Sequence, residues 1–366
     1  NNDGCSNACM QGATAIGAGI KHACAVRAGK LRCWGQNDSG QLGYGTTATI
    51  GDEPADLPLD DVMVGGDVLA VTAGTQHTCA LLVDKSVRCW GRGDMLGRGK
   101  GVYTDIGDQP NEMPPVDATD LGGPVVSIES GHYHTCAILE DDTIRCWGFS
   151  QYGECGYPGM NALDTPKLAG AVSVGAPVKQ IAAGDRFTCA LLKGPADGKV
   201  RCWGSNYTGQ LGLGHTQPIG FNQPPSSAPF VQIGEPVVQI DAGAAHVCVL
   251  ASSGAVYCWG EGAWGALGYQ NSQTIGDNEH PASAGAVKML AGNDTVSRIS
   301  LGDDHTCALL VGGGVRCWGY GDDGRLGYGD TNFLGNVPGP ISPLVAVDAL
   351  PGKARALALG ALHTCA

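Results

Sequence analysis

Sixteen cysteines carry the most obvious chemistry of this chain, and twelve of them recur as pairs. The first cysteine of a pair follows a small residue, and in three of the six pairs it follows His-Thr. The second cysteine lies nine to thirteen residues later in the phrase Cys-Trp-Gly. Such pairs can form disulfides or bind a metal, but no copy has two close cysteine pairs or a cysteine–histidine set at zinc spacing. Disulfides are therefore favoured. The predicted pairs are Cys24–Cys33, Cys79–Cys89, Cys136–Cys146, Cys189–Cys202, Cys248–Cys258 and Cys307–Cys317.

Histidines are the next candidates, but six of the nine occupy one position of the same recurring phrase, where Phe187 stands in the fourth copy. A side chain that returns at a fixed place in every copy is more often a hydrogen-bonding part of the fold than a ligand or a base. The chain also has no Gly-x-Ser-x-Gly, no His-Glu-x-x-His and no phosphate-binding glycine loop. We therefore predict no enzyme activity, no catalytic residue and no cofactor-binding residue. The six histidines are His22, His77, His134, His246, His305 and His363.

The elements that must position these residues follow from the period of the repeat. The first cysteines stand at positions 24, 79, 136, 189, 248, 307 and 365, which gives a period of about 57 residues. In each complete copy, two runs rich in Val, Ile and Leu flank a polar turn, as a β-hairpin requires, and no helical period is sustained. A period of this length fits a blade of about four short strands. The sequence therefore predicts an all-β, seven-bladed β-propeller with one disulfide per blade.

The recurring phrases also carry a family resemblance. Ala-Gly-x-x-His-Thr-Cys-Ala-Leu, Arg-Cys-Trp-Gly and Gly-Gln-Leu-Gly together resemble the repeat of the regulator of chromosome condensation family. The resemblance implies a seven-bladed β-propeller over residues 16–366, and the cysteines at both strand positions are similar to those of the secreted bacterial branch. The nuclear member activates a small GTPase and docks on nucleosomes through a basic arm and loop residues. This chain has no matching positions, so that function does not follow from the resemblance.

The two ends of the chain allow two interpretations. The seventh copy opens at Cys365 and lacks its Cys-Trp-Gly strand. Either Cys5 or Cys9 completes that blade from the N-terminal segment, or residues 1–15 are the tail of an upstream cysteine-rich repeat of a longer polypeptide. Cys155 replaces the leucine of the Gly-x-Leu-Gly phrase and is predicted to be a buried, unpaired thiol.

Composition limits the partners and the compartment. The formal net charge is −13, from 22 Lys and Arg against 35 Asp and Glu, and no basic cluster occurs. Nucleic-acid binding depends on clustered basic side chains and is therefore excluded from the prediction. The longest uncharged stretch, residues 242–260, is interrupted by a polar turn, so we predict no membrane insertion. Paired cysteines require an oxidising compartment, which predicts a secreted, extracellular or cell-surface protein.

Candidate contact residues lie in the loops. An Ile-Gly-Asp phrase recurs at one phase of the repeat and contains Asp52, Asp108 and Asp277, which form either an acidic contact surface or a simple turn. These carboxylates could offer oxygen ligands to calcium, but no segment has the dense acidic pattern of a calcium loop. Trp264 stands in a variable loop and is the best single candidate for a contact aromatic, with a buried packing role as the alternative.

Together these observations predict a non-catalytic scaffold that binds a protein partner. The scaffold is either a separate binding module or a subunit of a larger extracellular assembly that associates with its own copies. The alternatives are a carbohydrate-binding propeller, with a polysaccharide as the ligand, and a secreted enzyme inhibitor.

Overall fold

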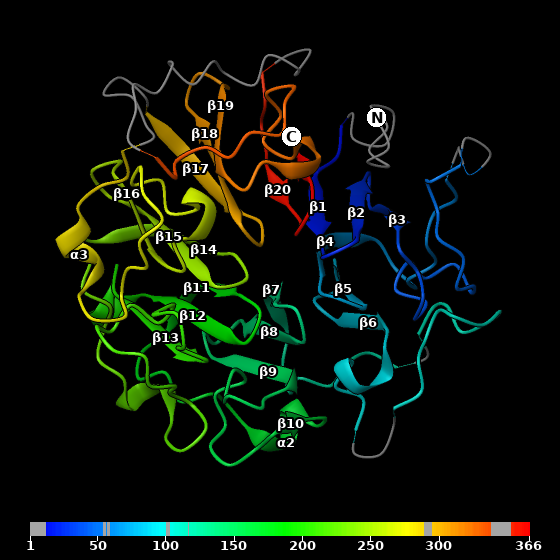
Figure 1. Cartoon of the computed structure of the whole chain (residues 1–366). Helices are drawn as coiled ribbons and strands as arrows, with labels where there is room; N and C mark the ends of the chain where they lie inside the picture. Colours follow the sequence, from blue (N-terminus) through cyan, green and yellow to red (C-terminus); the bar gives the residue numbers. More distant parts are fainter. Residues whose placement is uncertain are drawn as a thin grey trace.

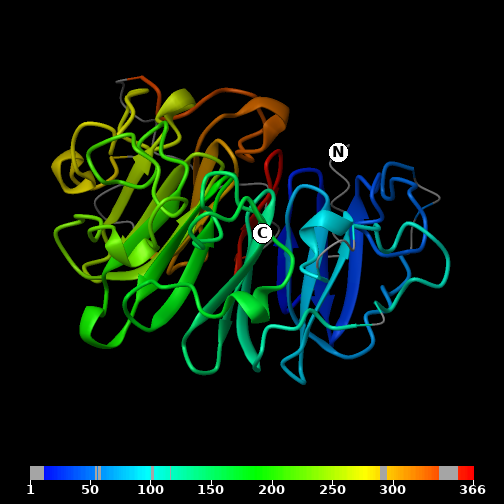
Figure 2. The ribbon, with the colours of Figure 1, turned by 90° about the horizontal axis from the view of Figure 1, so that it is seen from below.

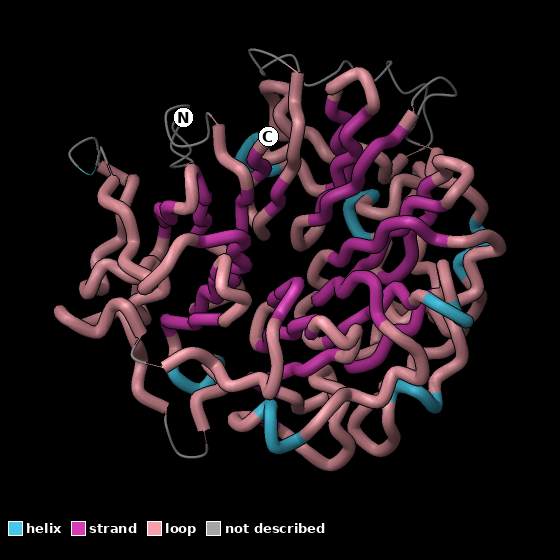
Figure 3. Tube along the Cα trace, turned by 180° about the vertical axis from the view of Figure 1, so that it is seen from behind, coloured by secondary structure: helices cyan, strands magenta, loops and turns pink. Residues whose placement is uncertain are grey.

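Seven small antiparallel sheets form a ring in the computed structural model of this chain (Figure 1). The structure describes residues 12–53, 56, 59–99, 103–115, 117–288, 295–337 and 353–366. The view from below shows the sheets side by side around the ring (Figure 2), and the view from behind shows the same ring (Figure 3). This arrangement confirms the predicted all-β, seven-bladed propeller. Cys5 and Cys9 lie outside the described residues.

Each sheet follows the chain from the centre of the ring outward. The first strands are β1 (Ala15–Ala18), β4 (Val68–Ala73), β7 (Val125–Ser130), β11 (Val178–Ala183), β14 (Val237–Ala242), β17 (Val296–Leu301) and β20 (Ala358–Leu359). The second strands are β2 (His22–Arg27), β5 (His77–Leu82), β8 (His134–Leu139), β12 (Phe187–Leu192), β15 (His246–Ala251), β18 (His305–Leu310) and β21 (Thr364–Cys365). The third strands are β3 (Lys30–Gly35), β6 (Val87–Gly91), β9 (Ile144–Phe149), β13 (Val200–Gly204), β16 (Val256–Gly260) and β19 (Val315–Gly319).

The fourth strand is shorter than the period predicts. A true outer strand, β10 (Ala162–Leu163), occurs in the third sheet. In five other sheets it is reduced to one bridge between the glycine of Cys-Trp-Gly and the first residue of the Ile-Gly-Asp phrase or its variant. The recurring phrase is thus an outer-strand remnant. The bridges are Gly35–Ile50, Gly91–Ile106, Gly204–Ile219, Gly260–Ile275 and Gly319–Leu334.

Short helical turns fill the loops. They are α2 (Pro166–Ala169), α3 (Pro281–Ala284), η2 (Gly93–Met95), η3 (Gly194–Ala196), η4 (Pro225–Ser227), η5 (Ala263–Gly265) and η6 (Asp322–Gly324). The ring closes where β20 contacts both β17 and β1, so the two ends of the described chain meet at one place (Figure 1).

The structure joins each of the six predicted cysteine pairs. In every case the two cysteines are directly opposite in the hairpin of the second and third strands, with Cα atoms 4.0–4.1 Å apart. Cys155 makes no disulfide and is fully buried, and its thiol lies 3.3 Å from the carbonyl oxygen of Phe149. Burial raises the pKa of this thiol well above its usual value, so it stays protonated and unreactive. Cys365 is buried in β21.

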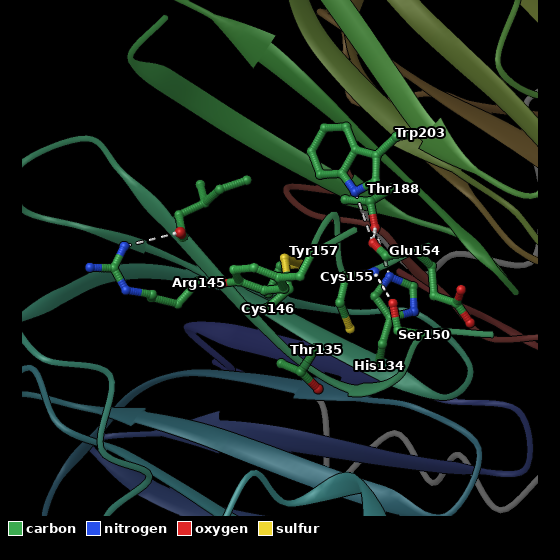
Figure 4. Close-up of a disulfide and its surroundings, with 12 residues drawn as sticks. His134, Thr135, Arg145, Cys146, Ser150, Glu154, Cys155, Tyr157, Thr188 and Trp203 are labelled. Carbon is green, nitrogen blue, oxygen red and sulfur yellow. Dashed lines mark hydrogen bonds between the residues drawn. A yellow bond between two sulfur atoms is a disulfide. The ribbon is translucent and has the colours of Figure 1, made fainter. Parts of the chain in front are cut away.

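Neighbouring blades are tied together by a hydrogen-bonded chain, which we call the inter-blade latch. Between the third and fourth blades, His134 Nε2 lies 2.7 Å from Thr188 Oγ1, and that hydroxyl donates to the carbonyl of Glu154 at 2.8 Å (Figure 4). Trp203 Nε1 donates to the same carbonyl at 2.9 Å. Because the Thr188 hydroxyl donates to the carbonyl, its oxygen accepts from His134 Nε2–H. All four groups are buried.

The latch explains the recurring histidines. The same chain joins the first blade to the second through His22, Thr78 and Trp90, and the fifth to the sixth through His246, Thr306 and Trp318. Burial lowers the pKa of His22 to about 3 and that of His246 to about 4, which keeps both rings neutral. These histidines therefore hold the ring together.

One joint replaces the latch with an apolar pair. Between the fourth and fifth blades, Phe187 stands at the histidine position and Val247 at the threonine position, and both are fully buried. The ring of Phe187 lies over Gly184 as that of His134 lies over Gly131. Both partners have changed together, so no buried donor is left without an acceptor.

Candidate interaction face

The turns that follow the first and third strands gather on one face of the ring, which we call the turn face. The hairpin turns between the second and third strands lie on the opposite face. Trp264, the predicted contact aromatic, is on the turn face in η5, directly after the third strand of the fifth blade. It is 46% exposed, whereas the other six tryptophans are at most 3% exposed. The alternative prediction, a buried packing role, is therefore wrong.

Trp264 belongs to a group of three aromatic residues that we call the Trp264 cluster. Its ring centroid lies 5.3 Å from that of Tyr320 and 5.1 Å from that of Phe333. Tyr320 and Phe333 stack on each other at 4.8 Å. Both belong to the sixth blade, so the cluster spans the joint between the fifth and sixth blades. The sequence separates Trp264 from Phe333 widely, and the repeat pattern gave no reason to place them together.

The backbone at Trp264 is in the left-handed region, with φ of 59°. The first and fourth blades have Asn37 and Asn206 two positions earlier in this turn, and each side chain accepts a hydrogen bond from a leucine N–H. The fifth blade has Gly262 there, because a Cβ would lie 1.9 Å from the carbonyl oxygen of Gln273. A left-handed conformation is uncommon for a bulky residue and costs about 1–3 kcal/mol. The fold of the other blades shows that a propeller does not need a tryptophan here.

Carboxylates surround the Trp264 cluster. The Tyr320 hydroxyl donates to Asp322 at 2.5 Å, and Asp323 has a side chain that is 72% exposed. Burial raises the pKa of nearby Asp304, and the charges of Asp303 and Glu261 add to this effect. Figure 1 shows these segments, from β16 to the loop after β19, as neighbours along the ring.

A cation beside the cluster is turned inward. Arg325 has a side chain that is 2% exposed, and its guanidinium lies over the Tyr320 ring at 4.7 Å. It donates to the carbonyls of Asp322 and Ala361 at 2.9 Å each and pairs with Asp323. The charge that reaches solvent beside the cluster is therefore negative.

A second group on the turn face alternates arginines with aromatic rings, and we call it the arginine–tyrosine band. Arg186 lies over the rings of Tyr133 and Tyr152, at 5.7 and 5.3 Å. The band continues through ring contacts and one further arginine across the second, third and fourth blades. Its members are Arg92, Tyr133, Phe149, Tyr152, Arg186 and Tyr207, of which Tyr207 is 64% exposed.

The three candidate aspartates do not come together. Asp52, Asp108 and Asp277 lie on the first, second and fifth blades, next to the bridge residues of each outer strand. Asp52 is exposed, whereas Asp108 and Asp277 are half-buried. A Cβ on Gly209 would lie 2.5 Å from the backbone nitrogen of Asp277, and a similar approach brings Asp108 against Gly40. The phrases of the second and fifth blades therefore pack against a neighbouring blade, which gives these residues a structural use.

A central channel of about 610 Å³ runs between the seven first strands. His132 lies at its mouth on the turn face, with ring nitrogens 3.2 Å from Asp185 and 2.9 Å from Asp303. Burial alone would lower the pKa of His132, but these two hydrogen-bonded carboxylates raise it to about 9. The protonated ring thus connects the third blade with the fourth and, across the mouth, with the sixth.

Two carboxylates line the channel itself. Burial, with a contribution from the charge of Asp241, raises the pKa of Glu129 to about 8, and burial raises that of Asp241 to about 7. Side-chain amides bridge neighbouring first strands in the wall, as where Gln180 bonds both the N–H and the C=O of Ile240. The wall is therefore part of the blade-to-blade hydrogen bonding.

Within the described residues, no group of three or more His, Cys, Asp or Glu side chains is arranged to hold a metal ion. The helices described are all too short to cross a membrane. What the turn face offers chemically is exposed aromatic surface and charge, which suit recognition of another molecule.

The repeated sheets, the register of the hairpins and the central channel define a β-propeller of the repeat-protein class. The chain belongs to the Regulator of chromosome condensation (RCC1) repeat family. The repeat matches residues 28–81, 141–191, 197–250 and 253–309 in one form of the family description. In a second form it matches residues 13–41, 68–95, 125–154, 178–210 and 296–325. RCC1 repeat domains are generally non-catalytic.

Known proteins place the chain in the same family. The ultraviolet-B receptor UVR8 of Arabidopsis thaliana is 32% identical over 267 residues, which are 72% of this chain and 56% of the receptor. The chain thus spans little more than half of that relative. The crystal structure of human WBSCR16 has a TM-score of 0.74 at 22% identity and covers 96% of this chain and 85% of its own. Prp20p of Saccharomyces cerevisiae has a TM-score of 0.69 at 21% identity and covers 95% and 80%. The two structures support the fold.

Proposed function

We propose that this chain is a non-catalytic binding scaffold that holds a protein partner on its turn face. The observation that carries the proposal is the exposure of aromatic side chains on turns that pack against a neighbouring blade. Trp264 and Tyr207 are 46% and 64% exposed. Aromatic residues are enriched in protein interfaces and among the residues that dominate binding energy, because they bury a large area at little entropic cost.

Solved structures of the same fold support a protein as the ligand. Yeast RCC1 (Prp20) has been crystallised with Kap60, and Prp20p is described together with its binding properties to Gsp1p and histones. We carry over to this chain only the use of the propeller as a protein-binding surface. We do not carry over the identity of the partners, because the present chain has a net charge of −13.

We further propose that the scaffold works outside the cytoplasm, as a secreted or surface-displayed protein or as part of an extracellular assembly. Six disulfides within short hairpins support this setting, because such bonds persist where the environment is oxidising. They also brace six of the seven blades without using the turn face, which leaves that face free for a partner.

Site-specific photo-cross-linking tests the proposal. A benzophenone amino acid replaces Tyr207 or Trp264 on the turn face, or Ser253 in a hairpin turn on the opposite face, where it serves as the matched control. The purified chain is irradiated in native surface extract and the cross-linked products are identified by mass spectrometry. We expect one protein to be captured from positions 207 or 264 and not from 253. Capture from 253 alone, or from none of the three positions, would refute the proposal.

A further inference from the structure

We infer that the Trp264 cluster binds a basic, extended segment of the protein partner, with a lysine or arginine side chain lying on the exposed face of Trp264. This inference rests on the proposed function and names the chemistry of the partner. It starts from the exposure of a single tryptophan out of seven. The six others fill the joints between blades, whereas Trp264 stands in a strained turn where Ser39 or Thr208 suffices in other blades.

The charge around the cluster selects a cation. Asp322, Asp323 and Glu261 lie on the two turns that present the aromatic rings, and Asp330 lies on the loop that presents Phe333. Arg325, the cation within this group, is buried and already bonded to two carbonyls. An approaching ammonium or guanidinium group therefore meets aromatic faces and carboxylates together, and both attract it. An acidic segment would meet repulsion from the same carboxylates.

The shape of the cluster selects an extended segment. The three rings pack on each other across two blades, with centroids 4.8–5.3 Å apart, and Trp264 is 46% exposed. The cluster is thus one continuous aromatic surface that crosses the blade joint. Side chains that project from an extended chain can contact such a surface in sequence, and alternate carboxylates on the two turns can pair with successive basic residues.

The arginine–tyrosine band provides an internal comparison on the same face. It has exposed aromatic surface as well, but the arginines over its rings reach solvent. The side chains of Arg92 and Arg186 are 41% and 40% exposed, against 2% for Arg325. A basic segment would meet like charge there. Tyr207, the most exposed ring of the band, is therefore the matched control for Trp264.

The test uses the purified chain and a synthetic probe, a twelve-residue peptide of four Gly-Lys-Ser units with blocked ends. Its Gly-Glu-Ser counterpart is the control peptide. Binding is measured by calorimetry and by the change in tryptophan fluorescence, which reports on Trp264 because the remaining tryptophans are buried. We expect the lysine peptide to bind, the glutamate peptide not to bind, and the fluorescence change to disappear in Trp264→Phe while most of the affinity remains.

The variants separate a specific site from general attraction to an acidic protein. Trp264→Ala is expected to weaken binding about tenfold, and Asp323→Asn about threefold, since asparagine keeps the left-handed backbone and removes the charge. Tyr207→Ala is expected to change binding less than twofold. Equal binding to wild type and Trp264→Ala, or no binding of the lysine peptide at all, would overturn the inference. Circular dichroism checks that each variant is folded.

The two proposals can fail separately. If position 207 captures a protein partner but Trp264→Ala leaves both that capture and the lysine peptide unaffected, the inference fails and the proposed function stands. If no position captures a protein, the proposed function fails whatever the peptide does. Capture of a second copy of this chain through position 264, or binding of a neutral polysaccharide that depends on Trp264, would replace the basic segment with that occupant.

Discussion

Removing one hydroxyl from an inter-blade latch should destabilise the whole ring. Thr188→Val keeps the shape of the side chain and deletes the group that accepts from His134 and donates to the Glu154 carbonyl, at 2.7 and 2.8 Å. Trp203 still donates to that carbonyl at 2.9 Å, so the acceptor remains satisfied. His134 Nε2–H, which is fully buried, loses its acceptor.

The expected magnitude follows from that orphaned donor. A buried polar group without a partner costs about 1–3 kcal/mol, so we expect Thr188→Val to lower the free energy of unfolding by about 2 kcal/mol. Replacing both partners with apolar groups of similar shape can be nearly neutral. The joint with Phe187 and Val247 already has this arrangement. The double variant His134→Phe, Thr188→Val should therefore lie within about 1 kcal/mol of wild type.

Equilibrium unfolding in guanidinium chloride with the disulfides intact measures these differences, with the fluorescence of the buried tryptophans as the signal. Thr188→Ser is the control, because it keeps the hydroxyl, and it should cost less than Thr188→Val. The reasoning is refuted if Thr188→Val unfolds at the wild-type midpoint. It is also refuted if the double variant is less stable than Thr188→Val, because the apolar pair would then not replace the latch.

Three further predictions concern the blade joints, the hairpins and the channel mouth. Gly209→Ala should lower the free energy of unfolding by about 3 kcal/mol, since the new Cβ meets backbone at 2.5 Å with φ of 70°. Gly254→Ala, with φ of 88° and open space, should cost about 1 kcal/mol, and thermal unfolding of both variants compares them. Cys248→Ala combined with Cys258→Ala should cost about 2–3 kcal/mol by guanidinium unfolding, because a ten-residue loop is released in the unfolded chain, and an unchanged midpoint would contradict this. His132 has a pKa of about 9 in the folded chain against 6.5 in the unfolded chain, so its contribution to the free energy of unfolding is complete below pH 6.5 and is lost as the pH rises through 9. The free energy of unfolding, measured from pH 6.5 to 9.5, should therefore fall less steeply in His132→Gln than in wild type. Parallel curves would argue against the ion pairs.

Much of the architecture could be predicted because a period of about 57 residues is a constraint on the whole chain. A blade cannot bury its two faces alone, so copies must stack, and hairpin geometry then brings Cys79 opposite Cys89 without further information. The length of the fourth strand could not be predicted. Pairing beyond Ile50 or Ile106 depends on how the following loop packs on the next blade, which is a property of tertiary structure.

The candidate site was predictable in only one residue. Trp264 departs from the repeat, and that departure identified it. The sequence did not identify Tyr320 and Phe333 as neighbours of Trp264, because their contact with Trp264 crosses a blade joint and joins loops of different length. The acidic phrases were predicted as a contact surface for the opposite reason, because they recur at one phase of the repeat. In the structure, two residues of these phrases, Asp108 and Asp277, pack against the neighbouring blade.

The positions that vary between blades are therefore the informative ones for binding. A residue in the latch or beside a joint glycine contacts two blades at once, and at the joint of Phe187 and Val247 both partners have changed together. A residue on the outer side of a turn has no such partner and can change alone. Trp264 is a change of this kind, and it costs backbone strain that the latch does not require. A side chain that is exposed, strained and unnecessary to the fold is best explained by a contact outside the fold, and for this reason we place the binding surface on the turn face and not in the channel.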